Sequence, residues 1–343
     1  MASYGTGDQV AASVPTGGVA GWGTWNLPNL VGPLNRLSPI EAPVLTMSGG
    51  LTGGMNSGGS PVFAWQDTLH RAPTIQSVVE GDDPVYTAQK RSARKNVVAI
   101  HQYGVELSYS KQAAINYVTP IAATGHNQGQ TNPVTSEMSW QLQIKLEQAA
   151  MDVEKMFLQG TYAFPTDGTA RQTQGLEGAI TDVALDAATA DDIVAAASTA
   201  TAAQIINAAM KAGYDNGWTD TVRVLMLNSA EKVDLESYAS TSNWNLQPLS
   251  RTEFGVNVTR IVTSFGDLDI VLNRHLTAKT ALFLNMSKIA PVFMPIPDKG
   301  HFFIEPLAKA GAYDRAQLYG EIGLAYGPQK EHAVVTTWGD VAA

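Results

Sequence analysis

The sequence contains no cysteine and carries little charge. Of its 343 residues, only 15% are Asp, Glu, Lys or Arg, whereas 44% are hydrophobic. The absence of cysteine excludes disulfides, thiolate nucleophiles and cysteine-bound zinc. About a quarter of the residues of a soluble monomer are charged. The low charge therefore indicates a chain that buries much of its surface, most economically against copies of itself.

Targeting signals and clustered cations are also lacking. The first residues, MASYGTGDQV, have neither the cationic nor the apolar region of a signal peptide, and no apolar run approaches membrane-spanning length. We therefore expect a soluble protein that assembles in the cytoplasm and has no membrane partner. The net charge of −9 argues against a dedicated nucleic-acid binder, because such binding relies on clustered cations.

No motif for catalysis or cofactor binding is found. There is no phosphate-binding loop, dinucleotide fingerprint or nucleophile elbow, so we expect no enzyme activity, no cofactor and no metal. Asp267 and Asp269 could share a cation at a strand edge, but a turn that enters a strand is the favoured interpretation. The histidines lack metal-ligand spacing, and each is interpreted as a lone polar residue: His70, His101, His126, His275, His301 and His332.

Residues 1–64 are rich in glycine and proline and almost uncharged. They hold 13 of the 31 glycines, 6 of the 17 prolines and only three charged residues. Such a density of Gly and Pro opposes helices and central strands, and the low charge argues against a solvated tail. We therefore predict an extended N-terminal arm that Trp22 and Trp25 anchor on another surface, such as that of a neighbouring subunit. A disordered linker is the alternative.

Residues 65–112 are predicted to form an extended loop built as a β-hairpin. From Tyr103 to Tyr109, apolar residues alternate with small or polar ones, as in a strand, and the stretch EGDDPVY supplies a turn before it. A hairpin standing alone is marginally stable in water, so it needs a partner surface. The hairpin contains four cations within six residues, Lys90, Arg91, Arg94 and Lys95. Contact with a neighbouring subunit and solvation explain them equally well, and contact with DNA is the weakest explanation.

Residues 135–159 are predicted to form a helix roughly 37 Å long. Most surface helices need a single apolar face, but this segment has two stripes at helical spacing. One stripe contains Met138, Leu142, Leu146, Ala149, Val153 and Phe157, and the other contains Trp140, Ile144, Met151 and Leu158. Both sides of this helix, including the side that carries Trp140, therefore need a surface that covers them.

The remaining segments have mixed periodicity. Residues 190–275 are predicted to form a compact α/β lobe, with VRVLMLN (222–228) as a buried strand and SAEKVDLESY as the start of a helix. Residues 276–343 are predicted to be mainly strands that return to the long helix. The chain as a whole is therefore expected to be α+β.

The order of these parts resembles the major capsid proteins of tailed bacteriophages with the Hong Kong 97 type fold. The branch typified by phage SU-ten is the most similar. The resemblance rests on an order of segments over about 75–343: KRSARKNVVAIHQYGVELSYSKQAA, then IKLEQAAMDVEKMFLQGT, then ARQTQGLEGAI with its Arg-x-x-x-Gly-Leu turn, and finally GAYDRAQLYGEIGLAYGPQKEHAVV.

The resemblance implies a domain organisation. It assigns 1–64 to the N-terminal arm, 65–112 to the extended loop, 113–189 to the peripheral domain with its spine helix 135–159, 190–275 to the axial domain, and 276–343 to the C-terminal strands of the peripheral domain. It also implies that one stripe of the spine helix packs on the chain's own β-sheet, and that the arm or loop of a neighbouring subunit covers the other stripe, which contains Trp140.

The resemblance also implies a function. The family builds hexamers and pentamers into an icosahedral shell around double-stranded DNA, which it encloses without sequence-specific binding, in the virion capsid. It allows separate scaffolding, portal and decoration proteins as partners. The long charged N-terminal scaffolding segment of some members is not seen here, so scaffolding is expected to be separate or absent.

Other functions compete with this expectation. A cargo compartment shell of the encapsulin type shares the fold and would enclose enzymes in place of DNA. A hydrolase-type α/β enzyme would be a monomer or small oligomer with a polar pocket in the 190–275 lobe. A phage tail or decoration protein would be β-rich and would lack the long helix.

Overall fold

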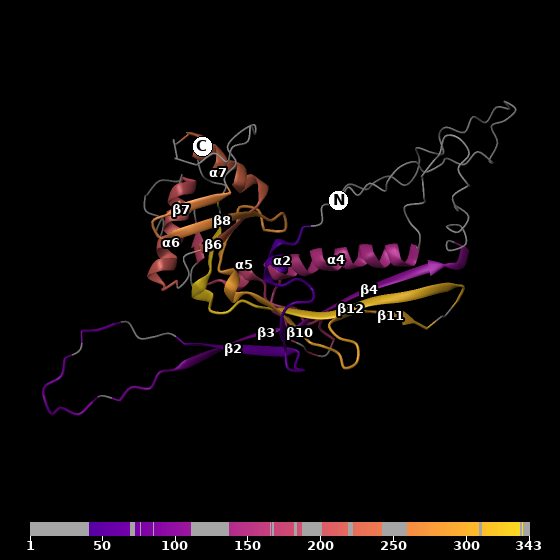
Figure 1. Ribbon diagram of the computed structural model, residues 1–343, viewed down its shortest axis with the longest axis horizontal. Helices are drawn as coiled ribbons and strands as arrows, with labels where there is room; N and C mark the ends of the chain where they lie inside the picture. The colour runs from indigo at the N-terminus through magenta and orange to yellow at the C-terminus, as the bar shows by residue number, and fades with distance from the viewer. Residues whose placement is uncertain are drawn as a thin grey trace.

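The structure is a computed structural model of the chain. It describes residues 41–68, 73–75, 77–84, 86–110, 137–164, 166, 168–181, 184–186, 201–218, 222–241, 259–308, 311–336 and 338. In Figure 1 the described chain is elongated, with a lobe at one side of a long helix and sheet and a hairpin that projects beyond them. In this part of the chain no helix is long and apolar enough to cross a bilayer.

A long sheet runs along the molecule and is centred on β12 (Tyr313–Ala325). One edge of β12 pairs antiparallel with β4 (Ala99–Ser108), from Tyr313 opposite Ser108 to Ile322 opposite Ala99. The other edge pairs with β10 (Ala290–Phe293) and β11 (Phe302–Leu307), and β10 in turn pairs with the short β1 (Met55–Asn56). This long sheet therefore joins segments from both halves of the sequence.

The second sheet forms the core of the lobe. Its strand order is β5 (Ala184–Asp186), β13 (Ala333–Thr336), β9 (Ala281–Leu284), β6 (Val222–Leu227), β8 (Gly266–Leu272) and β7 (Arg260–Thr263). Helices α6 (Ala202–Asp215) and α7 (Ser229–Thr241) bury apolar side chains against it, among them Ile205 and Leu235. The segments 222–228 and 229–238 thus form the strand and the helix that their periodicity predicts.

The lobe extends beyond the expected 190–275. Strands β9 and β13 lie after residue 275 and were expected to belong with the long sheet, but β9 pairs with β6 and β13 pairs with β9. All four residues of β9 are buried, because one face of this strand meets the α6–α7 core and the other meets the core beneath the long sheet. The segment 276–343 therefore divides between the two sheets, and the assignment needs this correction.

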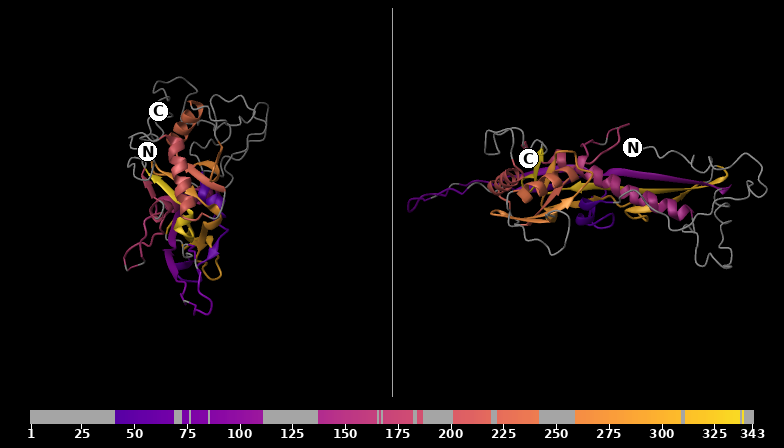
Figure 2. Two further views of the ribbon diagram at one scale, coloured as in Figure 1. Left: turned by 90° about the vertical axis from the view of Figure 1, so that its left-hand side faces the viewer. Right: turned by 90° about the horizontal axis from the view of Figure 1, so that it is seen from above.

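Helix α4 (Glu137–Gln159) lies along β4 and β12 (Figures 1 and 2). It corresponds to the helix expected over 135–159, of which residues 135 and 136 lie outside the described residues. With 23 residues it is about 35 Å long. Its C-terminal half enters a core shared by both sheets, in which Val153, Phe157 and Leu158 lie with Ile322 and Leu324 from β12 and with Leu282 and Leu284 from β9.

The chain leaves α4 through a close contact between two glycines. The Gly160 N–H donates to the Met156 carbonyl oxygen, and a Cβ at Gly160 would lie 2.5 Å from that oxygen. The Gly175 N–H donates to the Gly160 carbonyl oxygen at 2.8 Å, just before the short helix α5 (Leu176–Ala179). Arg171 forms an ion pair with Glu321 of β12. The Arg-x-x-x-Gly-Leu turn is thus a structural element that holds α4 on the long sheet.

The projecting hairpin consists of β2 (Val62–Thr68) and β3 (Arg91–Val97), which pair antiparallel from Val62 opposite Val97 to Thr68 opposite Arg91. The expected hairpin, 65–112, therefore differs in extent. The alternating residues from Tyr103 onward belong to β4 in the long sheet, where Val105 and Leu107 are buried. The alternation is correct for a half-buried strand, but it does not specify the partner strand.

Substitution of a buried residue of α4 should destabilise the subunit itself. Phe157 is fully buried, so Phe157→Ala should lower the free energy of unfolding by about 3–5 kcal/mol. Leu146, on the same helix and 41% exposed, is the matched control, and Leu146→Ala should cost about 1 kcal/mol or less. Chemical denaturation of the unassembled subunit measures both values, and equal losses would contradict this burial pattern.

Candidate assembly surfaces

The two apolar stripes of α4 are covered unequally along the helix. Near its C-terminus the chain buries residues of both stripes, Ala149, Val153 and Phe157 from one and Leu158 from the other. Near its N-terminus residues of both stripes are half-buried, and Leu146 is exposed. We expected one stripe to face the subunit and the other a neighbour. The division instead runs along the axis, because the helix extends beyond the region where the two sheets meet.

Trp140 lies on this incompletely covered half. Its side chain is half-buried, and its indole N–H is shielded from solvent without a hydrogen-bond partner among the described residues. A buried indole N–H usually finds a partner, so the hydrogen bond of the Trp140 indole is not supplied by the part of the chain that the structure describes. Trp22 and Trp25, the other tryptophans expected at an interface, lie outside the described residues.

The loop beyond the hairpin exposes apolar side chains to water. Ile75, Val78, Val79 and Tyr86 are between 68% and 104% exposed. Near them, Glu80, Asp82 and Asp83 are also exposed and give the loop an acidic tip. Removing a valine or isoleucine side chain from water contributes about 1.5–3 kcal/mol, so this loop gains stability only where another surface covers it.

The four predicted cations divide into two pairs with different environments. Arg94 lies opposite β2, with its Nε 2.8 Å from the Asp67 carboxylate, and Lys95 lies 5.9 Å from the centre of the Phe164 ring. These two residues contact their own subunit. Lys90 and Arg91 are exposed on the outer part of the hairpin, where Arg91 donates to Gln66 at 3.4 Å. Lys95 is also exposed, so Lys90, Arg91 and Lys95 all remain accessible to another molecule.

A buried carboxylate fixes the place where the N-terminal segment joins the body. Helix α2 (Pro43–Ser48) lacks a side-chain cap of its own. Its first N–H groups, of Val44 and Leu45, donate to Glu154 of α4 at 3.0 and 2.8 Å, and the Asn273 amide donates to the same carboxylate at 2.6 Å. Burial raises the pKa of Glu154, whereas these hydrogen bonds act in the opposite direction.

An exposed ion pair supplements this anchor. The Arg274 guanidinium donates two hydrogen bonds to Glu41, both 2.9 Å long. About half of each side chain is exposed, so the pair contributes about 1 kcal/mol or less. The anchor was not predicted from the sequence, although Glu154 has apolar residues at Val153, Phe157 and Leu158 around it on the helix, a pattern that indicates a buried carboxylate.

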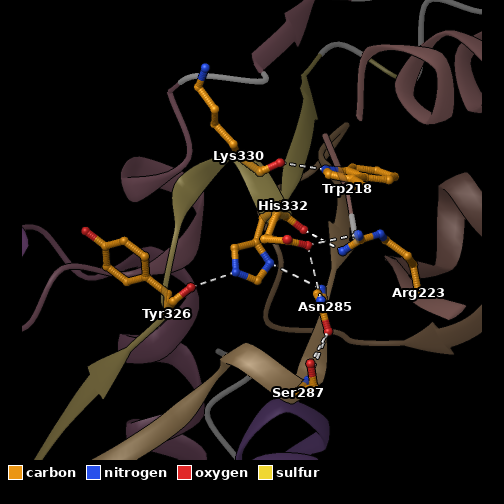
Figure 3. A network of polar contacts seen from close by, with 8 residues as sticks. Trp218, Arg223, Asn285, Ser287, Tyr326, Lys330 and His332 are labelled. Carbon is orange, nitrogen blue, oxygen red and sulfur yellow. Dashed lines mark hydrogen bonds and ion pairs between the residues drawn. The ribbon is translucent and has the colours of Figure 1, made fainter. Parts of the chain in front are cut away.

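A second buried polar network lies where the chain crosses between the two sheets (Figure 3). The fully buried guanidinium of Arg223, from β6, donates to the Glu331 carbonyl oxygen at 2.7 Å and to its carboxylate at 3.0 Å. The Trp218 ring stacks 4.0 Å from this guanidinium, and its indole N–H donates to the Lys330 carbonyl oxygen at 2.6 Å. These contacts hold the turn η2 (Gln329–Glu331) against the lobe.

His332 continues this network. The Asn285 N–H donates to His332 Nδ1 at 3.2 Å, and His332 Nε2 lies 2.7 Å from the Tyr326 carbonyl oxygen (Figure 3). Burial lowers the pKa of His332 to about 4. His332 lies between η2 and β13, as expected of a polar residue on a strand or loop, but it takes part in a buried network that the sequence analysis did not predict. Its place directly before the apolar run Ala333–Val335 is the signal that could have indicated burial.

The candidate cation site at Asp267 and Asp269 is occupied by a side chain of the chain itself. Arg260 of β7 forms ion pairs with both carboxylates, with its Nε 3.7 Å from Asp269. The favoured interpretation, a turn that enters a strand, agrees with this geometry. Across the described residues, no group of three or more His, Asp or Glu side chains is arranged to hold a metal ion.

Comparisons with known proteins identify the fold. A family model described as "SU10 major capsid protein" matches residues 15–338, and no curated protein matches the sequence. The capsid subunit of cyanophage A-1(L) is 12% identical, with 92% of this chain and 98% of that chain covered and a TM-score of 0.57. The Gordonia phage Cozz structure is 12% identical, with 96% of this chain and 99% of that chain covered and a TM-score of 0.55. The holo-SrpI encapsulin of Synechococcus elongatus PCC 7942 is 10% identical, with 92% of each chain covered and a TM-score of 0.51.

The Glu154 anchor yields a prediction about stability. Glu154→Ala leaves two buried N–H groups and the Asn273 amide without their acceptor, and should lower the free energy of unfolding by about 2–4 kcal/mol. It should also make the segment 41–48 accessible to proteases. Glu41→Ala, which removes only the exposed ion pair, should cost about 1 kcal/mol or less. Limited proteolysis and denaturation check both variants, and protection of 41–48 in Glu154→Ala would contradict the assignment.

Proposed function

The chain belongs to the SU10 major capsid protein family, and from that premise we propose that this capsid shell protein assembles as hexamers and pentamers into an icosahedral shell around double-stranded DNA. The observation that carries the proposal is the exposure of side chains on α4 and on the hairpin loop, which the described residues of one subunit leave incompletely covered. Leu146 on the helix and Val78, Val79 and Tyr86 on the loop are exposed apolar side chains, and none of them belongs to the buried cores. Copies of the same chain are the partners available in a shell.

The loop and the helix are suited to heterologous contacts between copies. The hairpin projects at one end of the molecule, whereas the N-terminal half of α4 lies toward the other end (Figure 1). A surface at one end that contacts a different surface at the other end generates a ring, provided that the rotation closes. A stable interface buries about 800 Å² on each partner, which the exposed loop, Trp140 and the N-terminal arm would supply together.

The charge distribution is compatible with enclosed DNA that the wall does not bind tightly. The net charge of the chain is −9, and three of the four predicted hairpin cations, Arg91, Arg94 and Lys95, contact residues of their own subunit. A shell of like charge holds DNA by closure, without adhesion to it. Assembly in the host cytoplasm and the participation of separate scaffolding, portal and decoration proteins belong to the same proposal.

The encapsulin match supports a second candidate, a shell that encloses protein cargo. That likeness is one of fold, at 10% identity, whereas the family match is to a capsid protein over most of the chain. The alternative of a hydrolase-type enzyme has no observation in its favour. Size-exclusion chromatography with negative-stain microscopy should reveal closed shells, and the nucleic-acid content of particles from infected cells then separates the two candidates. Particles that hold protein and no DNA would contradict the proposal.

Trp140→Ser tests the helix surface. The substitution should reduce the yield of closed particles at least tenfold, because it removes a half-buried ring from the surface proposed to face a neighbour. The unfolding free energy of the free subunit should fall by no more than about 1–2 kcal/mol. Trp140→Phe, which keeps an aromatic ring, is the matched control and should retain assembly. Parallel loss of folding and assembly in Trp140→Ser would place this side chain in the subunit core.

The double variant Val78→Ser and Val79→Ser tests the loop. Both side chains are exposed in the subunit, so the thermal unfolding temperature should stay within about 2 °C of the wild type. Assembly should fail or yield open fragments, since the apolar contact with a neighbour is lost. Negative-stain microscopy and sedimentation measure the outcome. Wild-type yields of closed shells would remove the loop from the proposed interface.

A further inference from the structure

Two chain crossings between the sheets lie side by side. The first leads from β9 through η1 (Met286–Lys288) to β10, and the second leads from β12 through η2 to β13. Each crossing takes the chain from one sheet to the other, so together they form the joint between the lobe and the long sheet. Asn285 begins the first crossing and His332 ends the second, and they are hydrogen-bonded to each other.

The geometry of this joint requires a neutral imidazole. His332 Nδ1 faces a backbone N–H, which can only donate, so this ring nitrogen must be an unprotonated acceptor. Nε2 faces the Tyr326 carbonyl oxygen, which can only accept, so Nε2 carries the proton. Both hydrogen bonds of the ring are thereby satisfied in one tautomer only. Because the side chain is fully buried, water cannot replace either partner.

We propose that His332 is a clasp that holds the lobe at a fixed angle to the long sheet, and that a second proton on its ring opens the clasp. A proton on Nδ1 would set two donors against each other across the contact with Asn285. The hydrogen bond that joins the two crossings would then be lost, while the apolar cores on either side remain. The expected result is a loosened joint between two folded parts.

The charges around the ring do not compensate a charged imidazole. Arg223 from β6 disfavours the charged imidazole and Glu331 from η2 favours it, but these two groups are paired with each other. Lys330 from η2 and Lys288 from η1 add cations near the joint. Burial is therefore the main cause of the lowered pKa of His332, and the charged form is at a disadvantage in the closed joint.

The sign of the pH dependence follows from this shift. The pKa is about 4 in the closed joint against 6.5 for a solvated histidine, so the open joint binds the proton more readily. Stability from the clasp is complete above pH 6.5 and is lost as the pH falls toward 4. A pKa difference of about 2.5 corresponds to a roughly 100-fold increase in the open population between pH 7 and pH 4, and the limiting factor of roughly 300 is reached only below pH 4.

Hydrogen exchange measured by mass spectrometry on the full-length chain tests the proposal. After correction for intrinsic rates, the peptide that contains the Asn285 amide should exchange faster as the pH falls from 7 to 4, whereas the central strand β6 should change little. His332→Asn keeps an acceptor near Nδ1 and does not titrate, so it should abolish the acceleration. Acceleration that persists undiminished in His332→Asn, or its absence in the wild type, would overturn the proposal.

Two further variants and one spectroscopic measurement complete the test. Glu331→Gln removes the neighbouring carboxylate and should retain an acid transition, whereas a transition lost only in this variant would assign the switch to Glu331. His101→Gln, at a half-buried histidine whose pKa burial also lowers, should behave as the wild type. Should His332→Asn fail to fold, ring ¹⁵N NMR of the wild-type chain decides: a neutral His332 with its proton on Nε2 at pH 6 supports the clasp, and a charged ring contradicts it.

Discussion

The burial of the C-terminal half of α4 between the two sheets is the constraint on which the rest of the structure depends. Val153, Phe157 and Leu158 touch a core to which β12 and β9 both contribute. Neither sheet closes that core alone, because β12 belongs to the long sheet whereas β9 pairs with β6 in the sheet of the lobe. The helix therefore fixes the lobe and the long sheet relative to each other, and it leaves its own N-terminal half with less cover.

Buried polar groups specify how the parts that share this apolar core are oriented. Apolar packing contributes most of the free energy but specifies orientation poorly, whereas a buried charge must meet its partner or incur a penalty of several kcal/mol. Glu154 positions α2, Arg171 pairs with Glu321 behind α4, and Arg223 with Glu331 fixes the joint. These contacts lie around the shared core, so a subunit can present the same surfaces to every neighbour.

Local periodicity in the sequence predicted several helices and strands, but it could not predict which distant strands pair. Helices α4 and α7 and strand β6 could be predicted because, for each of them, one continuous segment contains the whole pattern. The placement of β9 and β13 in the lobe, and of Tyr103 in the long sheet, depends on partners far away in the sequence. Among the candidate site residues, the proposed contacts of Trp140 and the hairpin cations with a neighbouring subunit stay predictions, and the pattern could not show that Arg94 and Lys95 contact their own subunit. Glu154 and His332 were missed because a charged or titratable residue looks solvated until its partners are known.

The central claim is that one subunit completes only the inner end of its helix and that copies of the chain cover the rest. Hydroxyl-radical footprinting of free subunits and assembled particles, read by mass spectrometry, tests this directly. The account predicts that Trp140, Leu146 and Tyr86 react in free subunits and are protected in particles, whereas Phe157 is protected in both. Equal reactivity of Trp140, Leu146 and Tyr86 in the two states would contradict it.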